Sequence, residues 1–128
     1  MSKRILVIDD EETVRKVLKI HLAKGGYDVK EAADGEEAIE QLKKNNFDLV
    51  ICDIMMPKKD GWEVLRAVRS QPRTKDIPVI FLTAKDQDAD MFKGYELGAN
   101  YYMTKPFTKS QLFFGINMMF GKESTSQY

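Results

Sequence analysis

FDLVICDIMMPKKDG, residues 47–61, is the stretch that decides the fold. Its four consecutive apolar residues, Leu49 to Cys52, suit a strand that is covered on both faces, as in a parallel α/β sheet. The run stops at a carboxylate, Asp53, and the Met-Met-Pro and Asp-Gly segments that follow are typical of a loop. Because ligands of open α/β sheets bind beyond the carboxyl ends of the strands, Asp53 is a candidate for chemistry.

Outward from this stretch, short apolar runs alternate with helical patterns. The first helical pattern is clear, because Val14, Val17, Leu18 and Leu22 form one apolar stripe. Strand and helix alternate five times, which predicts an α/β fold: a single doubly wound, five-stranded parallel sheet with five helices on its two faces. We expect strands over residues 5–8, 27–32, 49–52, 77–82 and 100–104, and helices over about 13–24, 34–45, 61–70, 87–97 and 108–120.

Length and composition limit the alternatives. The chain has 128 residues, the size of one domain; we assign residues 1–121 to it and expect 122–128 to be a polar, frayed tail. Lys plus Arg and Asp plus Glu each number 20, and the resulting zero net charge argues against direct nucleic-acid binding. The single Cys52 excludes an internal disulfide. No apolar run approaches the roughly 20 residues of a membrane span, and no secretory signal is present, so we expect a cytoplasmic protein without a membrane partner.

Polar residues end four of the predicted strands at the same edge of the sheet. They are Asp9-Asp10, Asp53, Thr83 and Lys105. In the flavodoxin-like strand order 2-1-3-4-5 the first and third strands are neighbours, which would bring the three acids into one crevice. Crowded carboxylates repel unless a cation neutralises them, and oxygen-rich sites suit Mg²⁺. A carboxylate nucleophile, a divalent ion, a fixed cation and a hydroxyl are the parts of phosphoryl transfer to an acid.

Together these motifs resemble the receiver domain of two-component response regulators, the chemotaxis regulators among them. The resemblance covers essentially residues 3–120, with the motifs in order and at compatible spacing. It is carried by Asp9-Asp10, by Asp53 with Met56-Pro57 and Asp60-Gly61, by Thr83-Ala84, and by Lys105-Pro106-Phe107.

The resemblance implies a phosphorylation-dependent signalling switch. Asp53 would accept a phosphoryl group from the phosphohistidine of a histidine kinase or histidine phosphotransfer protein, so the domain would catalyse only its own phosphotransfer and dephosphorylation. Mg²⁺ would be held by Asp10, Asp53 and the backbone carbonyl of Met55, with Asp9 acting largely through water. In the family, residues at the positions of Thr83 and Lys105 bind phosphoryl oxygens. Tyr102 falls at the aromatic switch position, which turns inward when Thr83 moves, and the Lys105–Pro106 bond is typically cis.

The last helical pattern holds more apolar residues than one buried stripe requires. The surplus predicts a partner surface on the face of the fourth helix, fifth strand and fifth helix, for an effector protein or domain or for a second copy of this chain. The apolar residues of this surface are Leu112, Phe113, Phe114, Ile116, Met118, Met119 and Phe120, with Phe92 and Tyr95 extending them.

The resemblance also implies a place for Lys85, which would border the path of the water that attacks the phosphoryl group.

Three other functions fit these residues less well. A degenerate receiver that serves only as a docking module is disfavoured by the complete set of acids, threonine and lysine. Phosphatases of the haloacid dehalogenase type usually carry a second acid two residues after the nucleophile, where this chain has Met55. A flavodoxin-like FMN carrier needs a hydroxyl-rich phosphate loop after the first strand, where this chain has acids.

Some of these residues also have possible structural roles. The acids at 9–12 would suit a helix N-terminus, where negative charge is favoured. His21 has no Cys or second His beside it and is expected to be structural.

Overall fold

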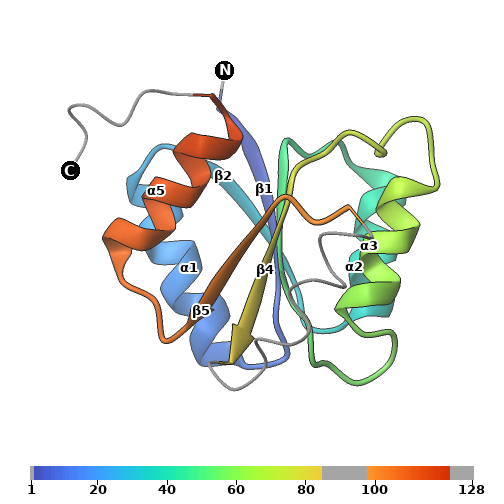
Figure 1. Ribbon diagram of the computed structural model, residues 1–128, viewed down its shortest axis with the longest axis horizontal. Coiled ribbons are helices and arrows are strands. Elements are labelled where there is room, and N and C mark those ends of the chain that lie inside the picture. Colours follow the sequence, from blue (N-terminus) through green and yellow to red (C-terminus); the bar gives the residue numbers. More distant parts are fainter. Residues whose placement is uncertain (1, 85–97, 122–128) are drawn as a thin grey trace.

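The computed structural model describes residues 2–84 and 98–121, which form a parallel sheet between two layers of helices (Figure 1). Each neighbouring pair of strands is parallel, and the order is β2-β1-β3-β4-β5. The predicted five-stranded sheet and its order are therefore confirmed. The strands are β1 (Arg4–Ile8), β2 (Asp28–Ala32), β3 (Leu49–Asp53), β4 (Val79–Ala84) and β5 (Tyr101–Lys105).

Two helices cover each face of the sheet within the described residues. α1 (Glu12–Lys24) and α5 (Lys109–Met119) lie on one face, and α2 (Gly35–Lys44) and α3 (Gly61–Arg69) lie on the other (Figure 1). Four of the five expected helices are thus present. The remaining helix, the fourth in chain order, was predicted over residues 87–97 with Phe92 and Tyr95, and it lies outside the described residues. Lys85 and the tail 122–128 also lie outside them.

Short polar side chains fix where three of the helices begin. The Asp34 carboxylate accepts the backbone N–H of Glu37 at the start of α2. Asp60 and Glu63 form a reciprocal capping box at α3, and Thr108 and Gln111 form another at α5. Each box satisfies backbone N–H groups that the first helical turn leaves unpaired. α1 differs, because the side chain of its N-cap residue, Glu11, makes no capping hydrogen bond.

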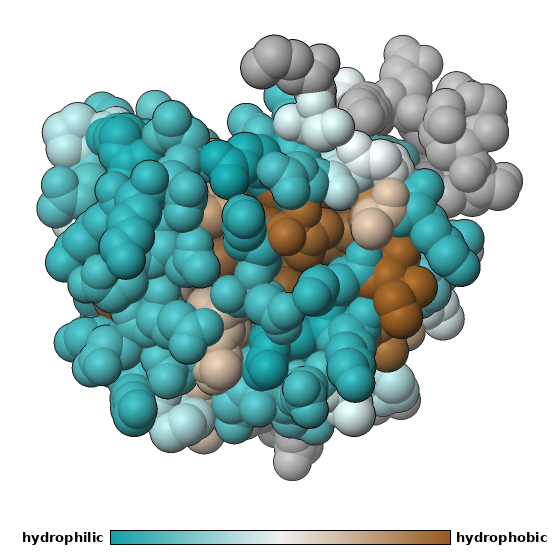
Figure 2. All heavy atoms as spheres, turned by 180° about the vertical axis from the view of Figure 1, so that it is seen from behind, coloured by the Kyte–Doolittle hydropathy of each residue, from teal (hydrophilic) through white to brown (hydrophobic). Residues whose placement is uncertain are grey.

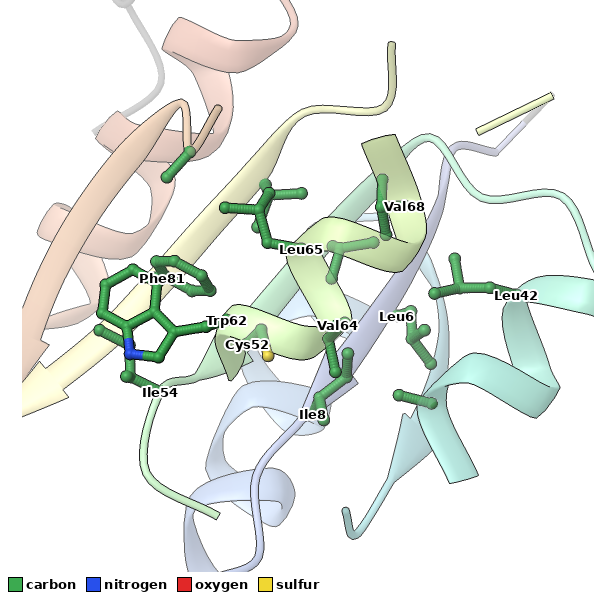
Figure 3. Packing of buried hydrophobic residues seen from close by; sticks show 14 of the residues in the cluster. Leu6, Ile8, Leu42, Cys52, Ile54, Trp62, Val64, Leu65, Val68 and Phe81 are labelled. Atoms are coloured by element: carbon green, nitrogen blue, oxygen red, sulfur yellow. The ribbon is translucent and has the colours of Figure 1, made fainter. Parts of the chain in front are cut away.

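The sheet has a hydrophobic core on each face. On one side α2 and α3 pack against β1, β3 and β4, and in Figure 3 Val64, Leu65 and Val68 of α3 lie over side chains such as Leu6 and Cys52 of the strands. α1 and α5 cover the second core on the opposite face. Every residue of β3 is buried, as the apolar run 49–52 predicts for a central parallel strand.

Two details of the sequence-based expectation are wrong. Val17 is 44% exposed although it was assigned to the inward stripe, because α1 meets the sheet along the row of Leu18 and Leu22, which are fully buried. The fourth strand begins at Val79 and continues through Ala84, so Thr83 lies inside it. Pro78 lacks an N–H, and it contributes only its carbonyl, which accepts the N–H of Val50.

Figure 2 shows how hydrophilic and hydrophobic side chains are distributed over one face of the molecule. The face behind the view of Figure 1 is mostly hydrophilic, with hydrophobic side chains gathered near its centre and toward one side (Figure 2). Among the described residues, no helix is long and apolar enough to cross a membrane.

Candidate functional site

The carboxyl ends of four strands bring the predicted residues together. Asp9 follows β1 directly, Asp53 ends β3, and Lys105 ends β5 in register with Ala84 of β4. One carboxylate oxygen from each of Asp9, Asp10 and Asp53 lies within 4.8 Å of the others. We call these three residues the acidic cluster. The expectation that strand order 2-1-3-4-5 brings these three acids close together is confirmed.

Lys105 is the cation of this site. Its ammonium lies 2.9 Å from Asp9 Oδ2, 3.1 Å from Glu11 Oε1 and 3.4 Å from Asp53 Oδ2. Lys105 therefore forms ion pairs with both Asp9 and Asp53, and Asp9 is the nearer of the two. The Lys105–Pro106 peptide bond is cis, as the resemblance implied.

Asp9 is fully buried at the base of the site. Its Oδ1 accepts the backbone N–H of Glu11 at 2.9 Å. Oδ2 is buried and forms an ion pair with the Lys105 ammonium at 2.9 Å, but among the described residues no donor points at it in good hydrogen-bond geometry. Burial raises the pKa of Asp9, against the lowering effects of the Glu11 N–H and of Lys105.

Within the described part of the chain, the acidic cluster has three carboxylates and Lys105 is the cation that the ion pairs place against it. Burial, and next the neighbouring Asp9, raise the pKa of Asp53 to about 6 although Lys105 opposes the shift. Burial alone would lower the pKa of Lys105, but its contacts with Asp9, Asp53 and Glu11 outweigh that effect and raise it. Hard divalent cations such as Mg²⁺ prefer carboxylate oxygens. The residues present therefore fit Mg²⁺, because they offer three acids, one of which has a buried oxygen without a well-aligned donor among the residues that the structure describes.

Thr83 and Tyr102 lie on the neighbouring strands β4 and β5. Thr83 is fully buried, and its hydroxyl contacts the carbonyl of Ala84 at 3.3 Å. Tyr102 pairs in register with Phe81, is buried, and packs edge-on against the Phe81 ring with centroids 5.6 Å apart. Phe81 in turn packs against Trp62 of α3. The aromatic side chain at the predicted switch position is therefore directed inward in this structure.

The loop after Asp53 is fixed on two sides by glycines. The N–H of Gly61 donates to the carbonyl of Ile54, and a Cβ at Gly61 would lie 2.7 Å from the carbonyl oxygen of Asp53. A Cβ at Gly35 of α2 would lie 1.9 Å from the carbonyl oxygen of Lys59. Only glycine permits such close backbone approaches. α2 and α3 thus hold the loop that follows the candidate nucleophile.

Two residues that contact the site were not among the predicted site residues. Glu11 reaches Lys105, and Arg15 of α1 donates from Nη1 to the carbonyl oxygen of Asp9 at 2.8 Å. Arg15 also donates from Nε to Glu31 of β2, so it joins α1, β1 and β2 behind the acidic cluster. The position of Glu11 directly after the aspartate pair was a visible signal. Nothing in the sequence singled out Arg15, because its two partners lie outside its own helix and no local pattern links it to them.

Comparison with known proteins agrees with this geometry. A family model described as the response regulator receiver domain matches residues 5–117. The chain is 46% identical over 112 residues to the alkaline phosphatase synthesis transcriptional regulatory protein PhoP of Bacillus subtilis (strain 168). That alignment covers 88% of this chain and 46% of PhoP, so the chain spans less than half the length of this relative.

Solved structures share both the fold and part of the sequence. A putative response regulator from Chloroflexus aurantiacus J-10-fl superposes with a TM-score of 0.90 at 37% identity, covering 95% of this chain and 100% of that one. The chemotaxis protein CheY4 of Vibrio cholerae gives 0.88 at 32% identity, with coverages of 93% and 99%. The receiver domain of the sensor histidine kinase PA1611 from Pseudomonas aeruginosa PAO1, solved with a magnesium ion in its active site cleft, gives 0.86 at 28% identity, with coverages of 95% and 100%. This chain therefore belongs to the response regulator receiver domain family.

Proposed function

We propose that this chain is a phosphorylation-dependent switch that accepts a phosphoryl group on Asp53 from the phosphohistidine of a partner protein. The observation that carries the proposal is the acidic cluster itself. Asp53 ends a central strand with carboxylate oxygens of Asp9 and Asp10 within 4.8 Å and the Lys105 ammonium at 3.4 Å. A carboxylate nucleophile, a fixed cation and a set of oxygens that can bind a divalent cation match the needs of phosphoryl transfer.

The chemistry is one bond exchanged for another. A carboxylate oxygen of Asp53 bonds to phosphorus as the phosphorus–nitrogen bond of the phosphohistidine breaks, and the imidazole nitrogen keeps the electron pair and takes up a proton. Lys105 compensates negative charge on the phosphoryl oxygens, and the Thr83 hydroxyl donates to one of them. Asp10, Asp53 and the backbone carbonyl of Met55, with Asp9 through water, would hold Mg²⁺, which supplies further neutralisation of the phosphoryl charge.

The output would be a change in what binds the surface beside β5. Tyr102 is the residue that we expect to report the phosphorylated state, because it lies on β5 in register with Phe81 of β4, two residues before Thr83. On α5, Phe114 and Met118 are 48% and 49% exposed, so this helix retains apolar surface outside the core. Exposed apolar side chains grouped on one element are typical of partner sites. We propose that this surface binds an effector protein or domain, or a second copy of the chain.

Intact mass spectrometry tests the proposal directly. The protein is incubated with acetyl phosphate and Mg²⁺ and quenched in acid from seconds onward, with Asp53→Ala and a chelator-treated sample in parallel. We expect a gain of about 80 Da, one phosphoryl group, that is absent from both controls. A folded wild-type protein that binds Mg²⁺ but gains no mass at any time point would contradict the proposal and leave a docking module as the function.

A further inference from the structure

The Lys105 ammonium is shared unequally among three carboxylates. Its two shorter contacts, to Asp9 and Glu11, come from the segment that joins β1 to α1, while Asp53 lies farther away at 3.4 Å. Asp9 and Asp53 are buried, whereas the Glu11 side chain is 58% exposed and that of Lys105 is 20% exposed. Glu11 therefore approaches the ammonium from the solvent side and Asp53 from the inside.

The backbone of Glu11 is fixed while its side chain is directed away from its own helix. Its N–H donates to Asp9 Oδ1 at 2.9 Å, which anchors the residue to the acidic cluster. Glu11 is the N-cap residue of α1, a position where serine, threonine, aspartate and asparagine are preferred because they cap. Its carboxylate makes no capping hydrogen bond and instead accepts from Lys105, 94 residues away in sequence.

We propose that Glu11 is a positioning residue that draws the Lys105 ammonium toward the solvent side of the acidic cluster, away from Asp53. Without this contact the ammonium settles between Asp9 and Asp53 and neutralises the oxygens that a divalent ion needs. Glu11 thus keeps the acidic cluster open to Mg²⁺. Because Glu11 is exposed, it releases Lys105 at little cost when a phosphoryl group arrives, whereas the buried Asp9 does not.

A double-mutant cycle separates this role from the general effect of a negative charge. Mg²⁺ affinity is measured by calorimetry at fixed ionic strength for Glu11→Gln, Lys105→Met and the double variant. The matched control is Glu12→Gln, which removes the same charge from the next, exposed residue. We expect Glu11→Gln to weaken Mg²⁺ binding by about two- to fivefold, the size of an exposed ion pair, and to do so only when Lys105 is present.

A second cycle needs no metal ion. Urea unfolding of the same variants in chelator gives the coupling between Glu11 and Lys105, and we expect a favourable coupling that the Glu12→Gln and Lys105→Met pair lacks. The Mg²⁺ measurement rests on the proposed function, and the two can fail separately. Wild-type protein that binds no Mg²⁺ would overturn the proposed function and leave the urea cycle to decide the Glu11–Lys105 contact.

Two results would overturn the role of Glu11. One is an effect of Glu11→Gln on Mg²⁺ affinity that persists in the Lys105→Met background or equals that of Glu12→Gln, since this is the signature of charge alone. The other is zero coupling between Glu11 and Lys105 in urea, which would show that the 3.1 Å contact holds nothing in place.

Discussion

Asp53 ionises in surroundings that oppose its charge. Burial and the neighbouring Asp9 raise its pKa to about 6, from 3.8 for the unperturbed group, and Lys105 offsets only part of this shift. An acid whose pKa is raised on folding favours the folded state while it is protonated. That contribution is fully present below about pH 4 and is lost as the pH rises through about 6. Above that range the ionised Asp53 lowers the free energy of unfolding in the absence of Mg²⁺.

Asp53→Asn tests how much the ionised Asp53 lowers the free energy of unfolding. Asparagine keeps the size and removes the charge, so we expect the free energy of unfolding to rise by about 1–3 kcal/mol at about pH 7.5 in chelator, and to change little near pH 4. Urea titrations at both pH values measure it. Excess Mg²⁺ should reduce the difference in free energy of unfolding between wild type and Asp53→Asn at about pH 7.5, because it binds the acidic cluster of the folded wild-type protein.

The control for that comparison is Glu40→Gln. Glu40 is an exposed acid whose nearest cation, Lys43, lies 3.9 Å away, so its removal should leave stability nearly unchanged at either pH. Equal stabilities of wild type and Asp53→Asn at about pH 7.5 would contradict the electrostatic account of the acidic cluster.

At the scale of elements, the loop between β3 and α3 is the strained part of the described chain. Lys58 and Lys59 have φ angles of 49° and 55°, the left-handed region that side chains with a Cβ disfavour. The loop keeps this conformation because Asp60 caps α3 and because Gly35 and Gly61 let neighbouring backbone approach closely. The strain lies at Lys58 and Lys59, in the loop that follows Asp53 and leads into α3.

Lys58→Gly should relieve part of this strain. Glycine adopts positive φ without steric cost, so we expect the free energy of unfolding to rise by up to about 1 kcal/mol. Lys58→Ala is the matched control, because it removes the same side chain and keeps the Cβ. The ion pair that both variants lose, 4.0 Å from Lys58 to Asp34, is too long and exposed to matter. Identical urea midpoints for the two variants would show that the backbone at residue 58 stores no strain.

At the scale of the whole molecule, the site exists because one sheet edge collects the ends of four strands. Much of this was predictable from sequence. The uninterrupted run Leu49 to Cys52 predicted a buried parallel strand. The acids, Thr83 and Lys105 each followed a predicted strand, so their convergence depended only on strand order. The order is confirmed by the parallel pairing of β1 with β2 and β3 and of β4 with β3 and β5.

What sequence could not supply was the direction of individual side chains. Periodicity placed Val17 on the inner stripe, but the angle at which α1 meets the sheet leaves it exposed. The three-way sharing of Lys105 depends on rotamers at residues 94 positions apart, for which no local pattern exists. The positive φ angles of Lys58 and Lys59 carry no signal either, since glycine or asparagine would be the expected residue there.

The measurement that tests the central claim most directly is the location of the phosphoryl group among the 20 acidic residues of the chain. Borohydride reduces an acyl phosphate to an alcohol and leaves free carboxylates unchanged, so the phosphorylated aspartate becomes about 14 Da lighter. Cleavage after lysine then releases residues 45–58, which contain Asp53 and, as an internal control, Asp48. The account predicts the mass change at Asp53 alone, and only after treatment with acetyl phosphate and Mg²⁺. A change at Asp48, at Asp9 or Asp10, or spread over several acids would contradict it.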